Sequence, residues 1–144
     1  MVEIKNILCA VDFSEISPKV ASYAQALAMK FKANVHVLYI APSMDQYGSF
    51  HVPSASIWDF VGGTVANVKM MDTFIKDNFN LMNAKGKVLS GDAAEKILGF
   101  AQSENIDLII MGTHGRRGFD KYFFGSVAEK VVKSSKIPVL SIRP

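Results

Sequence analysis

The chain alternates between short, almost wholly apolar runs and longer segments with the spacing of amphipathic helices. An apolar run without regular polar positions is typical of a strand buried on both faces of a parallel sheet. Such runs predict strands over residues 7–11, 35–40, 107–111 and 138–142, and a shorter strand at 88–89. Because strands that alternate with helices are joined by right-handed crossovers, the pattern predicts an α/β protein with a parallel sheet.

Four helices are expected between these strands. Ser17 as the N-cap and Pro18 in the first turn predict the start of the first helix, and capping boxes at Asp92 and Ser126 predict the starts of the third and fourth. The second helix is expected from about residue 61 to 83. The positions predicted to face the core are Val20, Ala24, Leu27 and Phe31 in the first helix, Val61, Val65, Val68, Ile75, Phe79 and Met82 in the second, Ile97, Leu98 and Ala101 in the third, and Val127, Val131 and Val132 in the fourth.

The layout predicts a five-stranded open sheet of the Rossmann-like type. With the first strand at the centre, the strand order is 3-2-1-4-5, and the first and fourth strands lie side by side. Ligands bind such sheets where the crossovers diverge, beyond the carboxyl ends of the strands. Asp12 follows the first strand and Gly112 ends the fourth. Two features 100 positions apart are therefore expected to meet at one crevice.

The fourth strand is connected to the last helix by a glycine pattern, Gly112-x2-Gly115-x9-Gly125-Ser126. Glycine at the strand end lets a ligand lie on the backbone, and Gly115 can adopt positive φ and turn successive N–H groups inward. Gly125 keeps the helix N-terminus open, so that an anion can reach the amides of Ser126 and Val127. The pattern predicts a phosphate site. The positive charges in the same loop are Arg116, Arg117 and Lys121.

Each of these features has a structural alternative. The glycines and Ser126 can simply mark a strand end and a helix cap, and neither G-x4-G-K-[ST] nor G-x-G-x-x-G after a strand is present. Asp12 either starts a turn, accepts hydrogen bonds from ribose hydroxyls, or holds a divalent cation. His114 either contacts a phosphate or faces solvent. The end of the second strand, Tyr39 and Ile40, has apolar side chains and free backbone groups that suit an adenine ring.

Composition narrows the function classes. With 49% hydrophobic and 20% charged residues, residues 1–144 are expected to form a single globular domain. The absence of a ~20-residue apolar run and of a signal peptide predicts a cytoplasmic protein without a membrane span. A net charge of +3 with scattered basic residues argues against nucleic acid as a partner. The single cysteine, Cys9, is expected to be a buried, inert thiol.

Catalytic chemistry is not indicated by the sequence. No Ser/His/Asp, Cys/His or paired-carboxylate arrangement and no metal-type spacing is present, so that no catalytic residue is predicted and metal ligands are left unassigned. The connection from about residue 41 to 62 carries Phe50, Trp58 and Phe60. A connection of this length is typical of a lid, a binding surface or a disordered segment, although Trp58 is expected to dock on the protein's own helices.

Two parts of the chain carry a family resemblance. The C-terminal signature of the universal stress protein family is closely resembled by residues 112–118, Gly-Thr-His-Gly-Arg-Arg-Gly, followed by 125–131, Gly-Ser-Val-Ala-Glu-Lys-Val. Residues 7–14 resemble its N-terminal signature and residues 137–143 its terminal strand. The resemblance implies a domain of the adenine nucleotide α-hydrolase-like type. It also implies the branch of the family that keeps the G-x2-G-x9-G-[ST] loop and binds ATP.

Residue roles follow from the same resemblance. It assigns Asp12 to the ribose and the backbone of Ile40 to the adenine. It assigns the phosphates to Gly112, Gly115, Gly125, Ser126 and Val127, and Ala10, Met111, His114 and Arg116 complete the candidate nucleotide contacts. The expected ligand is ATP, with ADP and AMP as alternatives, together with Mg²⁺.

The function implied is that of a stress-response module in which ATP switches a conformation or a surface for an unknown protein partner. Two alternatives stay open. One is a slow ATP hydrolase or self-phosphorylating protein, and the other is a structural dimer that does not bind nucleotide. An ATP pyrophosphatase-type enzyme is discounted, because residues 12–15, Asp-Phe-Ser-Glu, stand where its phosphate loop would follow the first strand.

The last strand predicts an assembly. Residues 139–142 form an apolar sheet edge near the end of the sequence. An uncovered apolar edge favours pairing with another chain, and a two-fold axis would pair this strand with its own copy. The resemblance implies a homodimer through the same strand.

Overall fold

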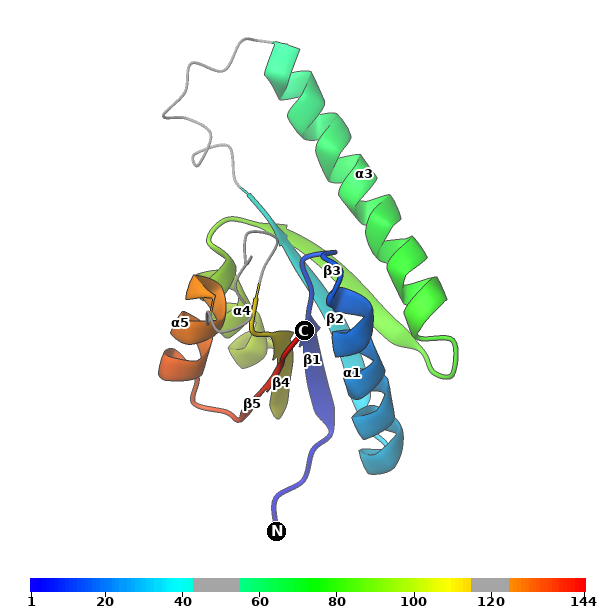
Figure 1. The fold of residues 1–144 in the computed structure, drawn as a ribbon, viewed down its shortest axis with the longest axis vertical. Helices are drawn as coiled ribbons and strands as arrows, with labels where there is room; N and C mark the ends of the chain where they lie inside the picture. The colour runs from blue at the N-terminus through cyan, green and yellow to red at the C-terminus, as the bar shows by residue number, and fades with distance from the viewer. Residues whose placement is uncertain (43–54, 115–124) are drawn as a thin grey trace.

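The computed structural model describes residues 1–42, 55–114 and 125–144, and for residues 55–64 it describes the backbone only. Within these residues, five parallel strands form one sheet of order β3-β2-β1-β4-β5 (Figure 1). The strands are β1 Asn6–Ala10, β2 Asn34–Ala41, β3 Ala84–Ser90, β4 Leu108–Gly112 and β5 Val139–Ile142. The predicted strand order and the α/β class are confirmed.

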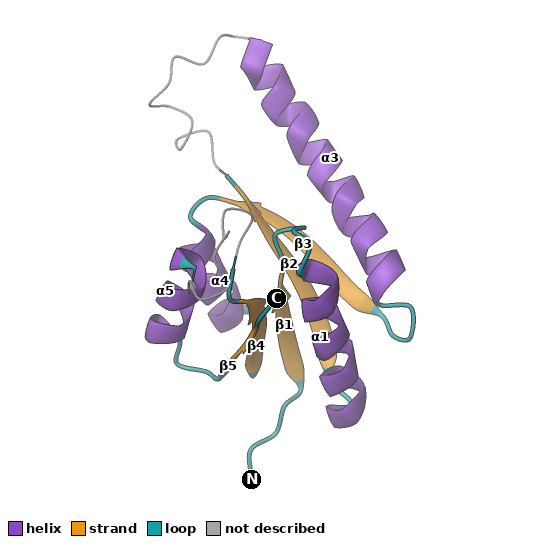
Figure 2. Cartoon of the chain, viewed as in Figure 1, coloured by secondary structure: helices purple, strands orange, loops and turns teal. Residues whose placement is uncertain are grey.

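Helices cover both faces of the sheet (Figure 2). The helices of the described residues are α1 Ser17–Phe31, α3 Ala55–Asn78, α4 Ala93–Ser103 and α5 Ser126–Ser134. On one face, Ile7 and Cys9 of β1 pack in a core with α1 and α3. On the other, Leu8 and Ala10 pack with α4 and α5. Because β1 is buried on both faces, its sequence is almost wholly apolar.

Strand β3 is longer than predicted. It spans seven residues and pairs with β2 along its whole length, from Ala84 beside Val35 to Ser90 beside Ala41. The sequence predicted only two of these residues, because the exposed Lys85 and Lys87 interrupt the apolar pattern. Exposed lysines are tolerated here since β3 lies at the edge of the sheet.

The predictions for α1 are correct at its centre and wrong at its ends. Val20 and Ala24 are buried as expected, but Phe31 is exposed and Ala28 is buried in its place. Ser17 is not the N-cap. The residue before the helix is Ile16, which makes no side-chain cap bond, while the Ser17 hydroxyl donates to the Asp12 carboxylate over 3.3 Å.

Helix α3 differs from its prediction in extent and in phase. It begins at residue 55 and ends at 78 instead of spanning 61–83. Among its described side chains, from residue 65 onward, Met71 and Phe74 are buried, whereas Val65 and Val68 are exposed. Its N-terminal turns extend beyond the ends of the strands (Figure 1), so that part of its apolar stripe has no sheet beneath it. Phe79 is buried in the turn after the helix.

Of the two predicted capping boxes, the N-cap bond is formed at Asp92 and is absent at Ser126. The Asp92 carboxylate accepts from the Glu95 amide over 2.9 Å, and Ile97 and Ala101 face the core as predicted. At α5 the N-cap is Gly125, so that Ser126 is already helical and makes no cap bond. Val131 is buried as predicted, together with Ala128, whereas Val127 and Val132 are exposed.

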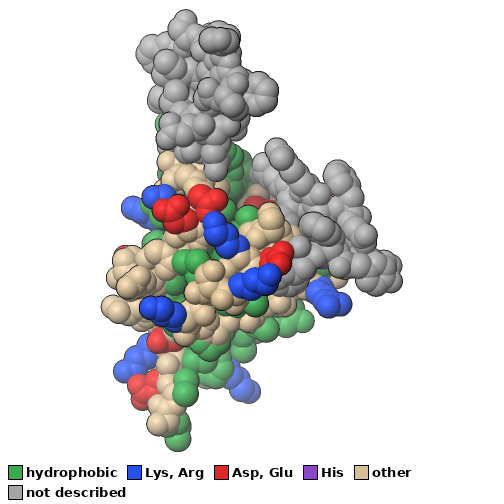
Figure 3. Space-filling view, turned by 90° about the vertical axis from the view of Figure 1, so that its left-hand side faces the viewer, with side chains coloured by type: hydrophobic (Ala, Val, Ile, Leu, Met, Phe, Trp, Pro, Cys, Tyr) green, Lys and Arg blue, Asp and Glu red, His purple; other side chains and the backbone are tan. Residues whose placement is uncertain are grey.

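Three further predictions concern properties of the molecule as a whole. Cys9 is fully buried, and burial raises the pKa of its thiol to about 12, as expected for an inert cysteine. No helix within the described residues has the length and apolar character needed to span a membrane. On the side of the molecule seen in Figure 3, basic and acidic side chains are interspersed.

Candidate functional site

The predicted crevice lies at the carboxyl ends of β1 and β4. The two strands are direct neighbours, and Ala10 pairs with Met111 at the end of β1. Both residues are buried. Asp12 follows β1 by two residues and Gly112 is the last residue of β4. The sheet register therefore brings together the two features that the sequence places 100 positions apart.

Asp12 organises the turn after β1 through one of its two carboxylate oxygens. Its Oδ1 accepts from the Ser14 amide over 3.0 Å and from the Ser17 hydroxyl over 3.3 Å. Phe13, between Asp12 and Ser14, has φ of 59°, a backbone conformation that is uncommon for a residue of this size. The second oxygen, Oδ2, has no hydrogen-bond partner among the described residues. Asp12 thus forms the turn with one oxygen, and its other oxygen has no bond within residues 1–42, 55–114 and 125–144.

The strained turn is held by aromatic packing. The Phe13 ring lies 4.6 Å from the Tyr39 ring and 5.7 Å from the Phe74 ring, measured between centroids. These contacts join the β1 turn to β2 and α3. Such pairs contribute about 0.5–1.5 kcal/mol beyond the burial of their area, enough to offset an unfavourable φ at one residue.

The end of β2 lies next to the turn after β1 and forms a second side of the candidate site. The β1–β2 ladder ends with the Val11 amide donating to the Leu38 carbonyl over 2.9 Å. In a parallel strand, alternate residues direct their N–H and C=O groups to the same side. The N–H and C=O groups of Ile40 therefore point towards the β1 side of β2, but at this height β1 has already ended. No bond from Ile40 to β1 is found in the described part of the chain. A planar heterocycle with donors and acceptors fits this position.

The segment after β4 is anchored at both ends. The Thr113 amide donates to the Ile142 carbonyl of β5 over 2.9 Å, and the Gly125 amide donates to the Thr113 carbonyl over 2.7 Å. A Cβ on Gly112 would lie 3.3 Å from the Ile16 side chain and 3.5 Å from the His114 carbonyl. The carbonyl distance is an ordinary van der Waals contact, so a side chain here would require only a small shift of Ile16.

His114 points into the protein rather than into solvent. The residue is only 8% exposed, its Nδ1 lies 2.7 Å from the Thr113 hydroxyl, and its Nε2 is buried without a hydrogen-bond partner among the described residues. A buried polar atom without a partner is costly. His114 therefore has one buried polar atom without a partner among the described residues, and the alternative of a solvent-facing His114 is wrong.

The N-terminus of α5 is the third wall. The first amide with a helical partner is that of Glu129, which donates to the Gly125 carbonyl over 2.9 Å. The amides of Ser126 and Val127 precede it and have no partner within the helix. Both residues are exposed, and Gly125 has extended backbone angles that leave the first turn open. An anion placed here meets free N–H groups and the positive end of the helix dipole.

Two predicted contacts, Gly115 and Arg116, lie outside the described residues, as do Arg117 and Lys121. Within the described part of the chain, no group of three or more His, Cys, Asp or Glu side chains is arranged to hold a metal ion. Sequence reasoning missed the Thr113 hydroxyl beside His114 and the Ser17 hydroxyl beside Asp12. The adjacency of Thr113 to His114 was a usable signal, whereas the Asp12–Ser17 bond depends on the path of the turn.

A family model, the Universal stress protein family, matches residues 3–143. The chain belongs to the universal stress protein family. Universal stress protein MJ0531 of Methanocaldococcus jannaschii is 29% identical over 145 residues, a match that covers 96% of this chain and 82% of that protein. The solved structure of MJ0577, from the same organism, has a TM-score of 0.81 and 25% identity, and the match covers 99% of this chain and 98% of MJ0577.

Two solved structures of universal stress proteins contain a nucleotide. One, in complex with cAMP, has a TM-score of 0.74 and 14% identity, with 99% of this chain and 98% of that chain covered. The other, from Archaeoglobus fulgidus in complex with dAMP, has a TM-score of 0.63 and 19% identity, with 99% and 100% covered. At these identities the likeness establishes a common fold.

Proposed function

We propose that residues 1–144 form one nucleotide-binding domain of the stress response, in which an adenine nucleotide controls a conformation or a partner surface. The observation that supports this is that three polar groups at the carboxyl end of the sheet have no hydrogen-bond partner among the described residues. They are Oδ2 of Asp12, Nε2 of His114 and the first amides of α5. Each matches one part of a nucleotide.

The roles follow from the chemistry of each group. The free Asp12 oxygen accepts a hydrogen bond from a ribose hydroxyl, and the backbone of Ile40 binds the adenine edge. The amides of Ser126 and Val127 bind phosphate oxygens together with the helix dipole. His114, next to Gly112 and Thr113 at the end of β4, is proposed as a further phosphate contact. Gly112, Ala10 and Met111 form the floor, and Gly115 and Arg116 are proposed as further phosphate contacts.

The proposal takes ATP with Mg²⁺ as the ligand. Mg²⁺ in nucleotide sites is held mostly by phosphate oxygens and water, with one or two carboxylates. The described residues fit this mode, since they offer Asp12 beside the crevice and no separate metal cage. The universal stress proteins solved with cAMP and dAMP support an adenine nucleotide as the ligand class.

The test is direct. Freshly purified protein is denatured and the released small molecules are identified by mass spectrometry, and the emptied, refolded protein is titrated with ATP, ADP and AMP by calorimetry, with and without Mg²⁺. The proposal expects a released adenine nucleotide and saturable binding of at least one of the three. Absence of both would contradict it.

A further inference from the structure

The sheet has a second edge, β3, which the nucleotide site does not use. Among the strands of the described residues, it pairs with β2 alone. The Gly91 amide donates to the Ala41 carbonyl over 3.0 Å, at the end of this ladder. Because backbone groups alternate along a parallel strand, residues 85, 87 and 89 also bond towards β2. Gly86, Val88 and Ser90 therefore direct their N–H and C=O groups outward, as an unpaired edge.

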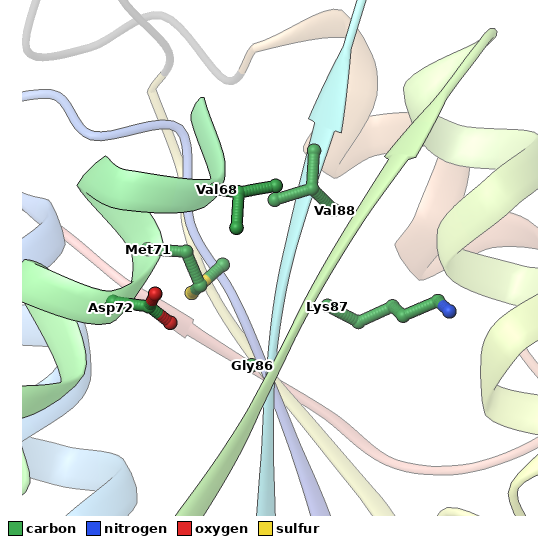
Figure 4. A pocket seen from close by; sticks show the side chains of 6 residues that line it. All are labelled: Val68, Met71, Asp72, Gly86, Lys87 and Val88. Atoms are coloured by element: carbon green, nitrogen blue, oxygen red, sulfur yellow. The ribbon is translucent and has the colours of Figure 1, made fainter. Parts of the chain in front are cut away.

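A hollow lies beside this edge, between β3 and α3 (Figure 4). Its volume is about 230 Å³, and its lining residues are Val68, Met71, Asp72, Gly86, Lys87 and Val88. Nucleotide-sized ligands occupy pockets of roughly 300–1,000 Å³, so the hollow suits one side chain. Val68 is 47% exposed, and the Asp72 carboxylate has no ion-pair partner among the described residues. The α3 side of the edge is thus apolar with one free negative charge.

The opposite side of the same edge is basic. Side chains alternate along a strand, and Leu89 packs in the core with α4 and α5. Lys85 and Lys87 have the same parity and lie on that face, and Figure 4 shows Lys87 pointing away from Met71 and Asp72. Both lysines are exposed, and neither has an ion-pair partner in the described residues.

These two faces select the occupant of the edge. A strand added beside β3 places alternate side chains on each face, so that one set meets Val68 and the hollow and the other meets the lysines. A second copy of β3 would bring Lys85 and Lys87 against their own equivalents, and like charges on adjacent strands are destabilising. Glutamate or aspartate side chains at those positions would instead be paired.

We propose that the β3 edge binds an extended segment of a partner protein in which apolar and acidic residues alternate, as an additional strand of the sheet. Main-chain bonds to Gly86 and Val88 hold the segment. One apolar side chain enters the hollow beside Val68, and the acidic side chains lie over Lys85 and Lys87. This surface is separate from the crevice at β1 and β4, so that the inference stands whether or not nucleotide binds.

The experiment uses two labelled peptides of seven residues with blocked ends. In one, valine alternates with glutamate, and in the other valine alternates with lysine. Fluorescence anisotropy is expected to show at least about tenfold tighter binding of the glutamate peptide, which corresponds to about 1.4 kcal/mol. The double variant Lys85→Glu, Lys87→Glu is expected to reverse the preference. Equal affinities for both peptides in the parent would overturn the proposal.

A backbone variant tests the mode of binding. Val88→Pro removes an outward N–H while the bonds to β2 stay in place, because proline is tolerated on the open side of an edge strand. It is expected to abolish binding of the glutamate peptide. The matched control is Ser141→Pro at the other edge, which is expected to leave that binding unchanged. Binding that survives Val88→Pro and disappears in Ser141→Pro would assign the peptide to β5 instead.

Amide NMR shifts give a readout that needs no variant. In a titration with the glutamate peptide, the amides of Gly86 and Val88 are expected to move more than those of Lys85 and Lys87, which are bonded to β2. The opposite order would exclude pairing at this edge. A β3-dependent dimer of the protein, lost in Val88→Pro, would show that a second copy is the occupant and would equally overturn the proposal.

Discussion

At the scale of single residues, Asp12 shows how one side chain serves the fold and the proposed site together. Oδ1 holds the turn through Ser14 and Ser17, and Oδ2 is the atom that we propose binds the ligand. The sequence offered turn, ribose and metal as alternatives for this residue, and spacing could not separate them. The turn is observed. Which of the remaining tasks Oδ2 performs depends on the ligand.

Asp12→Asn separates these tasks. The amide oxygen of asparagine can accept the two turn bonds, while the charged second acceptor is lost. We expect the melting temperature of the ligand-free protein to stay near that of the parent, and ATP binding to weaken by about 1–3 kcal/mol. Calorimetry with ATP and 2′-deoxy-ATP measures this. Asp12→Ala is the control that loses the turn as well.

A ribose role has a second signature. The parent should prefer ATP over 2′-deoxy-ATP, and this preference should shrink in Asp12→Asn. A parent that binds both nucleotides equally would assign Oδ2 to the metal ion or to the turn alone.

At the scale of elements, the strands were predictable and the helix faces less so. Strands β1 and β4 are buried on both faces, so their apolar runs identify them without knowledge of their neighbours. The stripe on α3 misled the prediction because Val65 and Val68 are apolar yet exposed. Periodicity identifies a helix, but which residues it buries depends on where the sheet ends beneath it.

The α5 N-terminus shows the same limit for caps. Ser126 with Glu129 fits a capping box, but the structure begins the helix at Ser126 with Gly125 before it. Glu129 instead pairs with Lys133 over 2.7 Å. A shift of one residue left the prediction of free amides intact, because the first turn lacks backbone partners wherever it starts.

The amides of α5 can be tested with one substitution. Gly125 has φ of −59° and ψ of 150°, a conformation favoured before proline, and the first helical position tolerates it. Ser126→Pro should therefore keep the fold and remove one N–H, weakening ATP binding at least about tenfold, or about 1.4 kcal/mol. Ser126→Ala, which removes only the hydroxyl, should change affinity much less.

Calorimetry and circular dichroism check both Ser126 variants. If Ser126→Pro is folded and binds ATP like the parent, the phosphates do not lie on the α5 N-terminus. The proposed role of the Ser126 and Val127 amides is then wrong.

At the scale of the whole molecule, ligand binding should appear as stability. At a hundredfold excess of ATP over its dissociation constant, mass action adds ~2.7 kcal/mol, and for a protein of this size the melting temperature should rise by about 5–10 °C. Differential scanning fluorimetry with ATP, ADP and AMP measures the shift, and inorganic tripolyphosphate is the control. No shift with any adenine nucleotide would contradict the proposed function.

The assembly is a prediction at the same scale. The Ile109 amide donates to the Pro138 carbonyl and the Thr113 amide to the Ile142 carbonyl, so that even-numbered residues of β5 bond to β4. By alternation, Val139 and Ser141 direct their backbone N–H and C=O groups outward, away from β4. Ser141→Pro should then shift a β5-paired homodimer towards monomer without loss of the β4 ladder, whereas Leu140→Pro should destabilise the fold.

Light scattering after size exclusion measures the assembly. Leu140→Lys is a second variant that places a charge in or near the predicted interface. A parent that is monomeric at tens of micromolar would show that β5 is not the interface. A double variant, Leu140→Lys with Ser141→Pro, that stays dimeric would show the same.

The bond from the Gly125 amide to the Thr113 carbonyl has a consequence for how such a chain can evolve. It closes the segment between β4 and α5 at its base, next to the anchor on β5. The free-energy cost of closing a loop, which is entropic, rises by only ~0.6 kcal/mol when the loop doubles in length. Insertions, deletions or replacements between the two anchors therefore cost the fold little, while they can remove the proposed phosphate contacts completely. The proposed ligand binding can thus be altered or lost by selection while the architecture is kept.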